Sequence, residues 1–544
     1  MDGNESNKLV KGALVLTLAG LISKILSAGY RIPLQNMTGD IGFYIYQQVY
    51  PILGMVTVLA LYGFPSAISK MAVDLKAAGK RLSFRGFYIP IFLLLAGING
   101  LLFLFLYIFA PTLAVWVGDG DLTSTYRFAA FAFLFIPFTA LLRGAFQGNF
   151  EMKPTAYSQI GEQFIRVCII ISAAVFVGLH GWDVYKIGQA AAMASIIGSI
   201  TAILILGFYF CKKENISLFS FRISVMKRKL VTHEQWQIPW KYYMKILITL
   251  GMIAALNHMV LLVIQFADAF TLVPGLMEHG FSKVTAMEAK GVFDRGQPLI
   301  QLGTVLGSSF ALALIPTISR EKLGSDPAGF YQYIRTALLF SFYLAVGATV
   351  GLIAIFPDAN LLLFQDNKGT FDLQILVLSI FLCSMAITAS SVLQGLGYVK
   401  RTAGFILISL LMKWIGNELF VPIWGITGSA IATIFSLTIL YLLVSLSLKR
   451  KLPALHFFRR LNGWALIRAI VAMVLYLFIL DYISSYFAIV SRLGLFMYVL
   501  FIAITGGGLF MLCLLRGRAF TEEELTMLPF ASFFIRIHKG RKNR

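Results

Sequence analysis

The stretch QGNFEMKPTA at residues 147–156 returns as QGLGYVKRTA at residues 394–403, 247 positions further along the chain. At the same offset Arg166 corresponds to Lys413, so a cation inside an apolar segment is repeated as well. A second pair of stretches repeats in the same order: PSAISK at residues 65–70 and PTISR at residues 316–320. We therefore predict a duplicated fold whose halves each carry positive charge within apolar surroundings. Duplicated apolar units of this kind are typical of membrane transporters.

Composition indicates that most of this chain lies in a membrane. Of 544 residues, 58% are hydrophobic and 13% are charged, which leaves too little polar surface for a soluble protein of this size. About fourteen apolar runs are long enough to cross a hydrocarbon core of about 30 Å. They start near residues 9, 45, 87, 125, 158, 186, 242, 291, 332, 371, 403, 424, 464 and 490. The predicted fold is an all-α polytopic membrane protein with two six-helix, pseudo-symmetric lobes around a central cavity and two additional C-terminal helices.

The formal charge of +21 is distributed unevenly along the chain. Most Lys and Arg residues, Arg143 among them, fall in alternate loops that begin with the N-terminal one. The intervening loops hold only Arg127, Lys186, Lys283, Lys290, Lys368 and Arg492. Positively charged loops stay in the cytoplasm, so we predict a multi-pass membrane protein with both termini in the cytoplasm. The basic loops suit anionic membrane lipids rather than nucleic acid, and we expect a monomer.

The apolar runs and the polar stretches between them predict five regions. They are an N-terminal lobe (1–211), a cytoplasmic amphipathic linker (212–241), a C-terminal lobe (242–448), a final helix pair (464–516) and a basic cytoplasmic tail (517–544).

Five cations lie at membrane depth in this topology: Lys24, Arg31, Arg166, Arg295 and Lys413. Each costs about 2.5–3.5 kcal/mol near the centre of a membrane helix, so these side chains must face a wet or shared interior. Lys24 and Arg31 are seven residues apart, which places both on one face of the first helix. A cavity lined by such cations suits an anion, and pyrophosphate can accept several charge-assisted hydrogen bonds.

Arg166 and Lys413 also allow a purely structural interpretation. Arg166 follows Glu162 by four residues, so the two side chains can pair along one helix. Lys413 has no glutamate at that spacing, because Glu418 lies five residues away on a different face of the helix. The repeated cation therefore recurs without the same local partner.

Arg295 and Asp268 also leave alternatives open. Arg295 follows Asp294 near the outer end of a helix, where its side chain could reach the membrane interface. Asp268 is either a helix-end acid or a ligand for a coupling cation.

Several chemistries are excluded by the sequence. No G-x-x-x-x-G-K-[ST] motif is present, so transport must draw on an ion gradient, the membrane potential or the substrate gradient, and we expect no cofactor or metal. Four cysteines lie in or beside apolar runs without metal-binding spacing. No large loop carries paired acids, which makes a membrane glycosyltransferase or ligase a poor fit.

Two groups of residues resemble a known family. RGAFQGNF at 143–150, followed by PTA at 154–156, Gln159, Glu162, Gln163 and Arg166, resembles the helix-four to helix-five signature of polysaccharide and lipid-linked oligosaccharide flippases of the MOP superfamily. Phe293-Asp294-Arg295 resembles helix eight of the MurJ-type lipid II flippases, in which a cavity arginine occupies the position of Arg295. Ser23 to Arg31 resembles their first helix, although Lys24 stands where arginine is usual and the spacing differs by about one residue. The resemblance covers most of the chain. Within this family, the sequence resembles the branch that contains the SpoVB-like and YtgP-like proteins.

This resemblance implies an alternating-access flippase, not an enzyme, that moves undecaprenyl-pyrophosphate-linked peptidoglycan precursor (lipid II) to the outer leaflet. The final two helices would form a groove for the polyprenyl tail, and cell-wall synthesis proteins would be partners. Pyrophosphate and sugar would be held by Lys24, Arg31, Arg295, Arg166 and Lys413, with support or ion coupling from Asp294, Glu162, Asp268 and Glu418. Two alternatives stay open: a flippase for another lipid-linked glycan, and a drug or cation antiporter of the same superfamily, whose cavity should be acidic.

Overall fold

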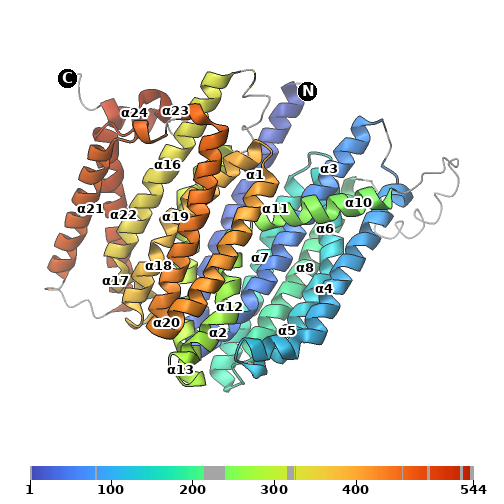
Figure 1. Ribbon diagram of the computed structural model, residues 1–544, viewed down its shortest axis with the longest axis horizontal. Helices are drawn as coiled ribbons and strands as arrows, with labels where there is room; N and C mark the ends of the chain where they lie inside the picture. Colours follow the sequence, from blue (N-terminus) through green and yellow to red (C-terminus); the bar gives the residue numbers. More distant parts are fainter. Residues whose placement is uncertain are drawn as a thin grey trace. The chain divides into compact units, whose positions relative to one another are not determined.

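Within the described residues, the fold consists of helices (Figure 1). A computed structural model describes residues 3–79, 82–213, 239–314, 324, 326–455, 457–484, 486, 491–526 and 531–539. No β-strand occurs in these ranges, and eleven helical stretches within them are long and apolar enough to cross a membrane. The predicted all-α polytopic membrane protein is confirmed. Most of the predicted linker (214–238) and the PTISR repeat (316–320) lie outside the described residues.

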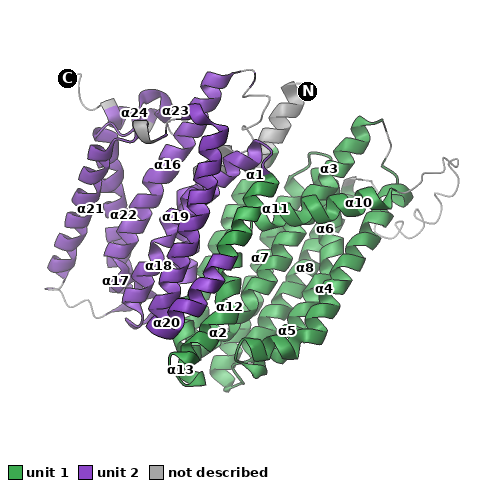
Figure 2. Cartoon of the chain, viewed as in Figure 1, with its two compact units in different colours: residues 1–294, 399–410 green, residues 295–398, 411–544 purple. Residues whose placement is uncertain are grey.

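The chain divides into two compact units, coloured separately in Figure 2. Unit 1 comprises residues 1–294 and 399–410, and unit 2 comprises residues 295–398 and 411–544. This division groups residues 240–294 with the N-terminal helices, whereas the predicted lobes were 1–211 and 242–448. The lobe boundaries remain a prediction.

Unit 1 contains most of the first eight membrane segments. Its elements are α1 (Gly3–Gly29), α2 (Arg31–Val58), η1 (Leu59–Gly63), α3 (Phe64–Ala77), η2 (Phe84–Tyr88), α4 (Ile89–Trp116), η3 (Gly120–Leu122), α5 (Thr123–Ala130), η4 (Phe131–Phe135), α6 (Ile136–Gln147), α7 (Lys153–His180), α8 (Lys186–Lys213), α10 (Trp240–Ile246), η5 (Leu247–Gly251), α11 (Met252–Asn257), α12 (Val260–Glu278) and α13 (Lys283–Asp294).

Unit 2 has a core between α16, α21 and α22, in which Phe340 and Phe520 stack with ring centroids 4.3 Å apart. Buried Tyr343, Met473 and Phe510 extend this core. The elements in this part of the chain are α14 (Gly296–Leu314), α16 (Pro327–Ala354), α17 (Phe356–Phe364), α18 (Thr370–Val377), α19 (Ser379–Gly395), α20 (Val399–Lys451), η7 (Pro453–Leu455), η8 (Phe457–Arg460), α21 (Gly463–Ser484), α22 (Arg492–Arg516), α23 (Glu522–Thr526) and α24 (Ala531–Lys539). The first turns of α20, residues 399–410, belong to unit 1.

The repeated sequences occupy equivalent places in the two halves. Gln147 is the last residue of α6 and Lys153 the first residue of α7. In the second copy, α19 ends at Gly395 and α20 begins at Val399. Each copy therefore spans a helix end, a short turn and the next helix start, as expected for a duplicated unit.

Two glycines break helices that otherwise run on without a gap. Gly39 in α2 has φ 68° and ψ −174°, and Gly425 in α20 has φ 58° and ψ −137°. Glycine adopts such positive φ values without the steric penalty that a Cβ atom brings. Two of the eleven stretches contain these glycines, and each divides there into two crossing segments. With α14 added, the described residues hold the predicted fourteen crossing segments.

A third glycine brings α13 against the backbone of α2 within unit 1. A Cβ atom added at Gly291 would lie 2.2 Å from the carbonyl oxygen of Asp40, directly after the break at Gly39. The contact involves backbone atoms, so no side-chain rotation can relieve it.

We predict that Gly291→Ala lowers the free energy of unfolding by about 1–3 kcal/mol, because the added methyl group forces the two backbones apart. The measurement is the melting temperature of the purified full-length protein. Gly97→Ala in α4 is the matched control, because a Cβ atom at Gly97 meets nothing within 4 Å and alanine favours helix. An equal loss in both variants would contradict this packing.

Candidate functional site

Lys24 and Arg31 lie on one helical path in unit 1, although α1 ends at Gly29 and Arg31 begins α2. The backbone hydrogen bonds from Tyr30 N to Leu26 O (3.3 Å) and from Leu34 N to Tyr30 O (3.1 Å) continue the helix across this junction. Lys24 is exposed, whereas Arg31 is 0% exposed. The pair therefore contains one accessible and one enclosed cation.

The guanidinium of Arg31 lies among aromatic rings. Its central carbon is 3.9 Å from the centroid of the Tyr50 ring, a cation–π distance. Nη2 donates to Ser27 Oγ at 3.3 Å, and the hydroxyls of Tyr30 and Tyr46 are hydrogen-bonded to each other nearby. Nε and Nη1 make no hydrogen bond of acceptable geometry to any described residue. Buried donors without acceptors are costly, so these two N–H groups are candidates for hydrogen bonds to water or to a ligand.

Other buried polar atoms near this part of unit 1 also lack protein partners. The helices α1, α2 and α7 contact one another. Examples of polar atoms on these helices that make no hydrogen bond within the described structure are Ser23 Oγ, Gln47 Oε1, Gln163 Nε2 and Arg166 Nε. These three helices thus offer donors and acceptors to water or to a polar ligand.

Arg166 is paired, as its spacing from Glu162 predicts. Arg166 Nη2 lies 2.7 Å from Glu162 Oε1, and the other carboxylate oxygen lies 2.8 Å from Arg143 Nη2. Arg143 also donates to Ser158 Oγ at 3.2 Å and to Ala60 O at 3.2 Å. The prediction that Arg143 is a cytoplasmic loop cation is wrong, because this residue lies in α6 and is 0% exposed. One carboxylate therefore neutralises two guanidinium groups, a feature that residue spacing alone did not reveal.

Lys290 and Asp294 form a second buried pair in unit 1. Their Nζ and Oδ2 atoms are 2.6 Å apart, one helical turn along α13. Lys290 is 1% exposed, so its predicted position in an outer loop is wrong. Lys290 lies in α13, a short helix before α14 that was predicted as part of the loop. Asp268, on α12, is also 1% exposed.

Arg295 is held by a carboxylate within unit 2. Its Nη1 and Nη2 atoms lie 2.5 Å and 3.1 Å from the two oxygens of Asp366, and the residue is 1% exposed. Asp366 follows α17 in a short loop, 71 residues further along the chain. Partial burial raises the pKa of the Asp366 carboxyl, but hydrogen bonds from Arg295 and from the backbone of Lys368 outweigh it and lower the pKa overall. Sequence spacing could not show this partner.

Lys413 is fully buried in unit 2, at 0% exposure. Its Nζ atom lies 2.9 Å from Asn417 Oδ1 and 2.8 Å from Thr433 Oγ1, and both the carbonyl and the hydroxyl oxygens of Ser429 are 2.9 Å away. Glu418 is exposed on another face of α20, as its helical spacing predicts. Ser429 and Thr433 were missed because only the break at Gly425 brings them back to Lys413.

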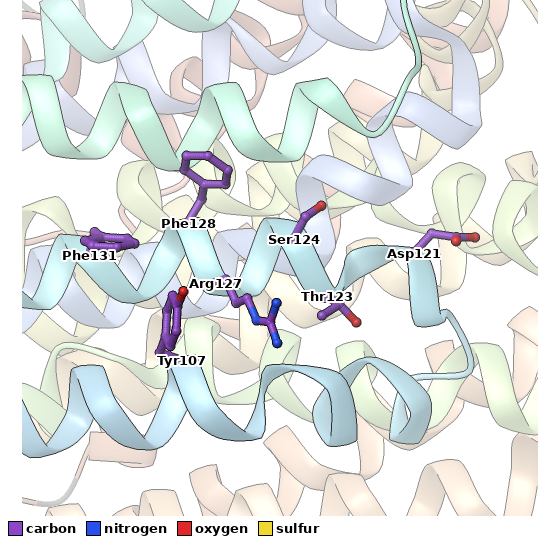
Figure 3. A pocket seen from close by; sticks show the side chains of 7 residues that line it. All are labelled: Tyr107, Asp121, Thr123, Ser124, Arg127, Phe128 and Phe131. Atoms are coloured by element: carbon purple, nitrogen blue, oxygen red, sulfur yellow. The ribbon is translucent and has the colours of Figure 1, made fainter.

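A pocket elsewhere in unit 1 contains none of the five cations predicted at membrane depth (Figure 3). Its volume is about 480 Å³, and its lining residues are Tyr107, Asp121, Thr123, Ser124, Arg127, Phe128 and Phe131. The Arg127 guanidinium lies 5.6 Å from the Tyr107 ring. Within the described ranges, no cluster of three or more His, Cys, Asp or Glu residues could hold a metal ion.

Fourteen membrane segments, an internal duplication and buried cations define a polytopic membrane protein of the transporter class. A family model described as "Polysaccharide biosynthesis protein" matches residues 9–322. The uncharacterised membrane protein YabM of Bacillus subtilis is 37% identical to this chain over 98% of this chain and 97% of YabM. The chain therefore belongs to the polysaccharide biosynthesis protein family.

Two further comparisons concern the flippases named above. The lipid II flippase MurJ of Bacillus subtilis is 25% identical over 79% of this chain and 80% of its own length. A solved lipid II flippase MurJ in an inward closed conformation has a TM-score of 0.63 at 16% identity, covering 92% of this chain and 99% of that one. The sequence-based resemblance to MurJ-type flippases of the MOP superfamily is confirmed.

We predict that Glu162→Gln lowers the free energy of unfolding by about 3–5 kcal/mol, because it removes the carboxylate shared by two buried arginines. Thermal unfolding of the purified protein measures this loss. Glu418→Gln makes the same chemical change on an exposed face of α20 and should alter stability by less than about 0.5 kcal/mol. Similar losses in the two variants would show that Glu162 does not neutralise the arginines.

The pair formed by Arg295 and Asp366 should stabilise the protein in a pH-dependent way. Because the pKa of Asp366 is lowered on folding, its contribution is present above the unfolded value of about 3.9 and is lost as the pH falls through the lower folded value. We predict that Asp366→Asn lowers the melting temperature at pH 7 and that this difference shrinks below about pH 4. In an Arg295→Gln background the effect of Asp366→Asn should be small throughout, and a persistent difference there would assign the stabilisation to another partner.

Proposed function

We propose that this protein is a flippase that moves undecaprenyl-pyrophosphate-linked peptidoglycan precursor, lipid II, from the inner to the outer leaflet of the bacterial cytoplasmic membrane by alternating access. The observation that carries the proposal is the environment of Arg31. This guanidinium is 0% exposed and keeps Nε–H and Nη1–H donors without a described protein acceptor. Phosphate oxygens are suitable acceptors, because guanidinium groups bind phosphate through paired, charge-assisted hydrogen bonds.

The surroundings of Arg31 support an anionic headgroup over a cationic drug. Lys24 adds a second positive charge on the same helical path, and Tyr50 holds one face of the guanidinium. Polar atoms on α1, α2 and α7, such as Gln47 Oε1 and Gln163 Nε2, are available for sugar hydroxyls or water. A cavity for cations would need acidic side chains where these positive charges stand.

The other predicted cations have different roles in this proposal. Arg295 of unit 2 would bind a phosphate by exchanging its contact with Asp366, which lies 2.5 Å away in this conformation. Arg166 and Lys413 would keep their protein partners and position neighbouring polar groups. Asp294 and Glu162 would balance buried charge through Lys290 and the arginine pair, and Asp268 is the candidate for ion coupling.

The remaining parts of the proposal concern orientation, energy and partners. The uneven distribution of Lys and Arg supports cytoplasmic termini. Transport would be driven by an ion gradient or by the membrane potential, without a cofactor, and the protein would act as a monomer among membrane lipids and cell-wall synthesis proteins. The similarity to the lipid II flippase MurJ supports this substrate, whereas YabM, an uncharacterised protein, points to no substrate.

In cells depleted of their own lipid II flippases, we predict that this protein restores delivery of lipid II to the outer leaflet. Arg31→Gln should reduce delivery by about tenfold or more, because it removes charge-assisted hydrogen bonds worth about 1.5–3 kcal/mol. Arg127→Gln is the matched control, since Arg127 is an exposed arginine of the same unit and lines the pocket shown in Figure 3, which does not include Arg31. Membrane abundance of each variant is measured in parallel.

Two outcomes would overturn parts of this proposal. Wild-type protein that is folded and abundant but delivers no lipid II would exclude this substrate and favour another lipid-linked glycan. Delivery that persists in Arg31→Gln, or falls equally in Arg127→Gln, would remove the assigned role of Arg31.

A further inference from the structure

The side-chain nitrogen of Lys413 is enclosed by oxygen atoms from both arms of the broken helix α20. Asn417 contributes its amide oxygen from the first arm, at 2.9 Å. Ser429 contributes its carbonyl and hydroxyl oxygens at 2.9 Å each, and Thr433 its hydroxyl oxygen at 2.8 Å, from the second arm. All four residues are buried, with Thr433 the most exposed at 4%. The charge is therefore stabilised by fixed groups of the protein rather than by bulk water.

These four atoms form a donor set that suits a small cation. A carbonyl, an amide oxygen and two hydroxyls are hard oxygen ligands, the kind that alkali and alkaline-earth cations prefer. An ammonium group has three hydrogen atoms to donate, yet four oxygens lie within hydrogen-bond distance of Nζ. A spherical cation would use all four at once. The oxygen set is therefore larger than an ammonium group requires.

The backbone of α20 fixes this arrangement. Lys413 and Asn417 are one turn apart on the first arm, and Ser429 and Thr433 are one turn apart on the second. The Thr433 hydroxyl donates to Ser429 O at 2.9 Å, which leaves its oxygen lone pairs for the cation. Broken membrane helices with free carbonyls form ion sites in many transporters.

The close approach of the two arms depends on a glycine. A Cβ atom at Gly428 would lie 2.2 Å from Phe420 O, so the arms contact each other through backbone atoms. This backbone contact holds the two arms, and the oxygen atoms that they carry, close together.

We propose that these four oxygens constitute a site for a monovalent alkali cation, which Lys413 fills with its own ammonium group. The protein then carries a tethered positive charge at a place where an exchangeable Na⁺ could otherwise bind. The consequence of this tethered charge for transport rests on the proposed function. The wild-type flippase would bind no ion at this site, so this site would not couple transport to an ion gradient. The existence of the site does not depend on what the protein transports.

Removal of the ammonium group tests the site. In purified full-length Lys413→Ala, NaCl should raise the melting temperature saturably by a few degrees relative to choline chloride at equal ionic strength, because a bound cation stabilises the folded state. Wild-type protein should show no such difference. Radioactive ²²Na⁺ should bind to Lys413→Ala and not to wild type, and LiCl and KCl would establish size selectivity.

Two control variants separate ion binding from a general loss of stability. Lys413→Met keeps most of the side-chain volume without a charge and should be destabilised with no response to Na⁺. Lys413→Ala combined with Thr433→Val removes one of the four oxygen ligands. The NaCl concentration that gives half of the stabilisation should therefore rise by about tenfold or more.

A poorly folded alanine variant remains informative. If Lys413→Ala unfolds in choline chloride, the proposal predicts rescue by NaCl, LiCl or KCl, and Lys413→Ser supplies a second variant with an added hydroxyl. The proposal is overturned if neither variant responds to any alkali cation, if both fail to fold in all four salts, or if wild type shows the same saturable shift. None of these readouts uses lipid II, so failure here is distinguishable from failure of the proposed function.

Discussion

Positive charge buried at membrane depth must be neutralised or solvated, and much of this structure satisfies that requirement. Glu162 neutralises two arginines, Asp294 neutralises Lys290, and Asp366 neutralises Arg295. These pairs fix helix positions within each unit, because separating either partner would leave an unpaired charge in a low-dielectric interior. Arg31 differs from this pattern, since its Nε and Nη1 donors are unmatched within the described structure. That difference separates Arg31 from the cations whose charge is paired with a carboxylate of the same unit.

The order of the membrane segments could be predicted from the sequence because hydrophobic length is a local property. The duplication was also readable, since both copies mark the same helix–turn–helix position. The charge partners were not readable in general. Glu162 and Arg166 are one helical turn apart, but Asp366 reaches Arg295 from 71 residues away. Arg143 and Lys290 were misassigned to loops because each lies within a few residues of a helix end, where hydropathy alone places boundaries poorly.

The two copies of the duplicated unit stabilise their equivalent cations by different means. Arg166 is balanced by a carboxylate, whereas the four oxygens around Lys413 described above are neutral. The duplication has therefore kept the sign of the charge and changed its stabilisation. Carboxylate pairing ties a cation to one partner, whereas an oxygen cage distributes the interaction over several dipoles. The second arrangement depends on backbone geometry, which is why the break at Gly425 matters as much as any charged residue.

Gly39 and Gly425 also constrain how this fold can evolve. Both have positive φ values that a side chain would strain, and both set the direction of the helix that follows. Cations and polar ligands can be exchanged one at a time, as ligand specificity changes, while the backbone path is retained. Gly39 and Gly425 cannot be replaced in this way, because another residue would be strained at these positive φ values. Among relatives that keep this fold, we therefore expect the charged positions to diverge with substrate and the two glycines to persist.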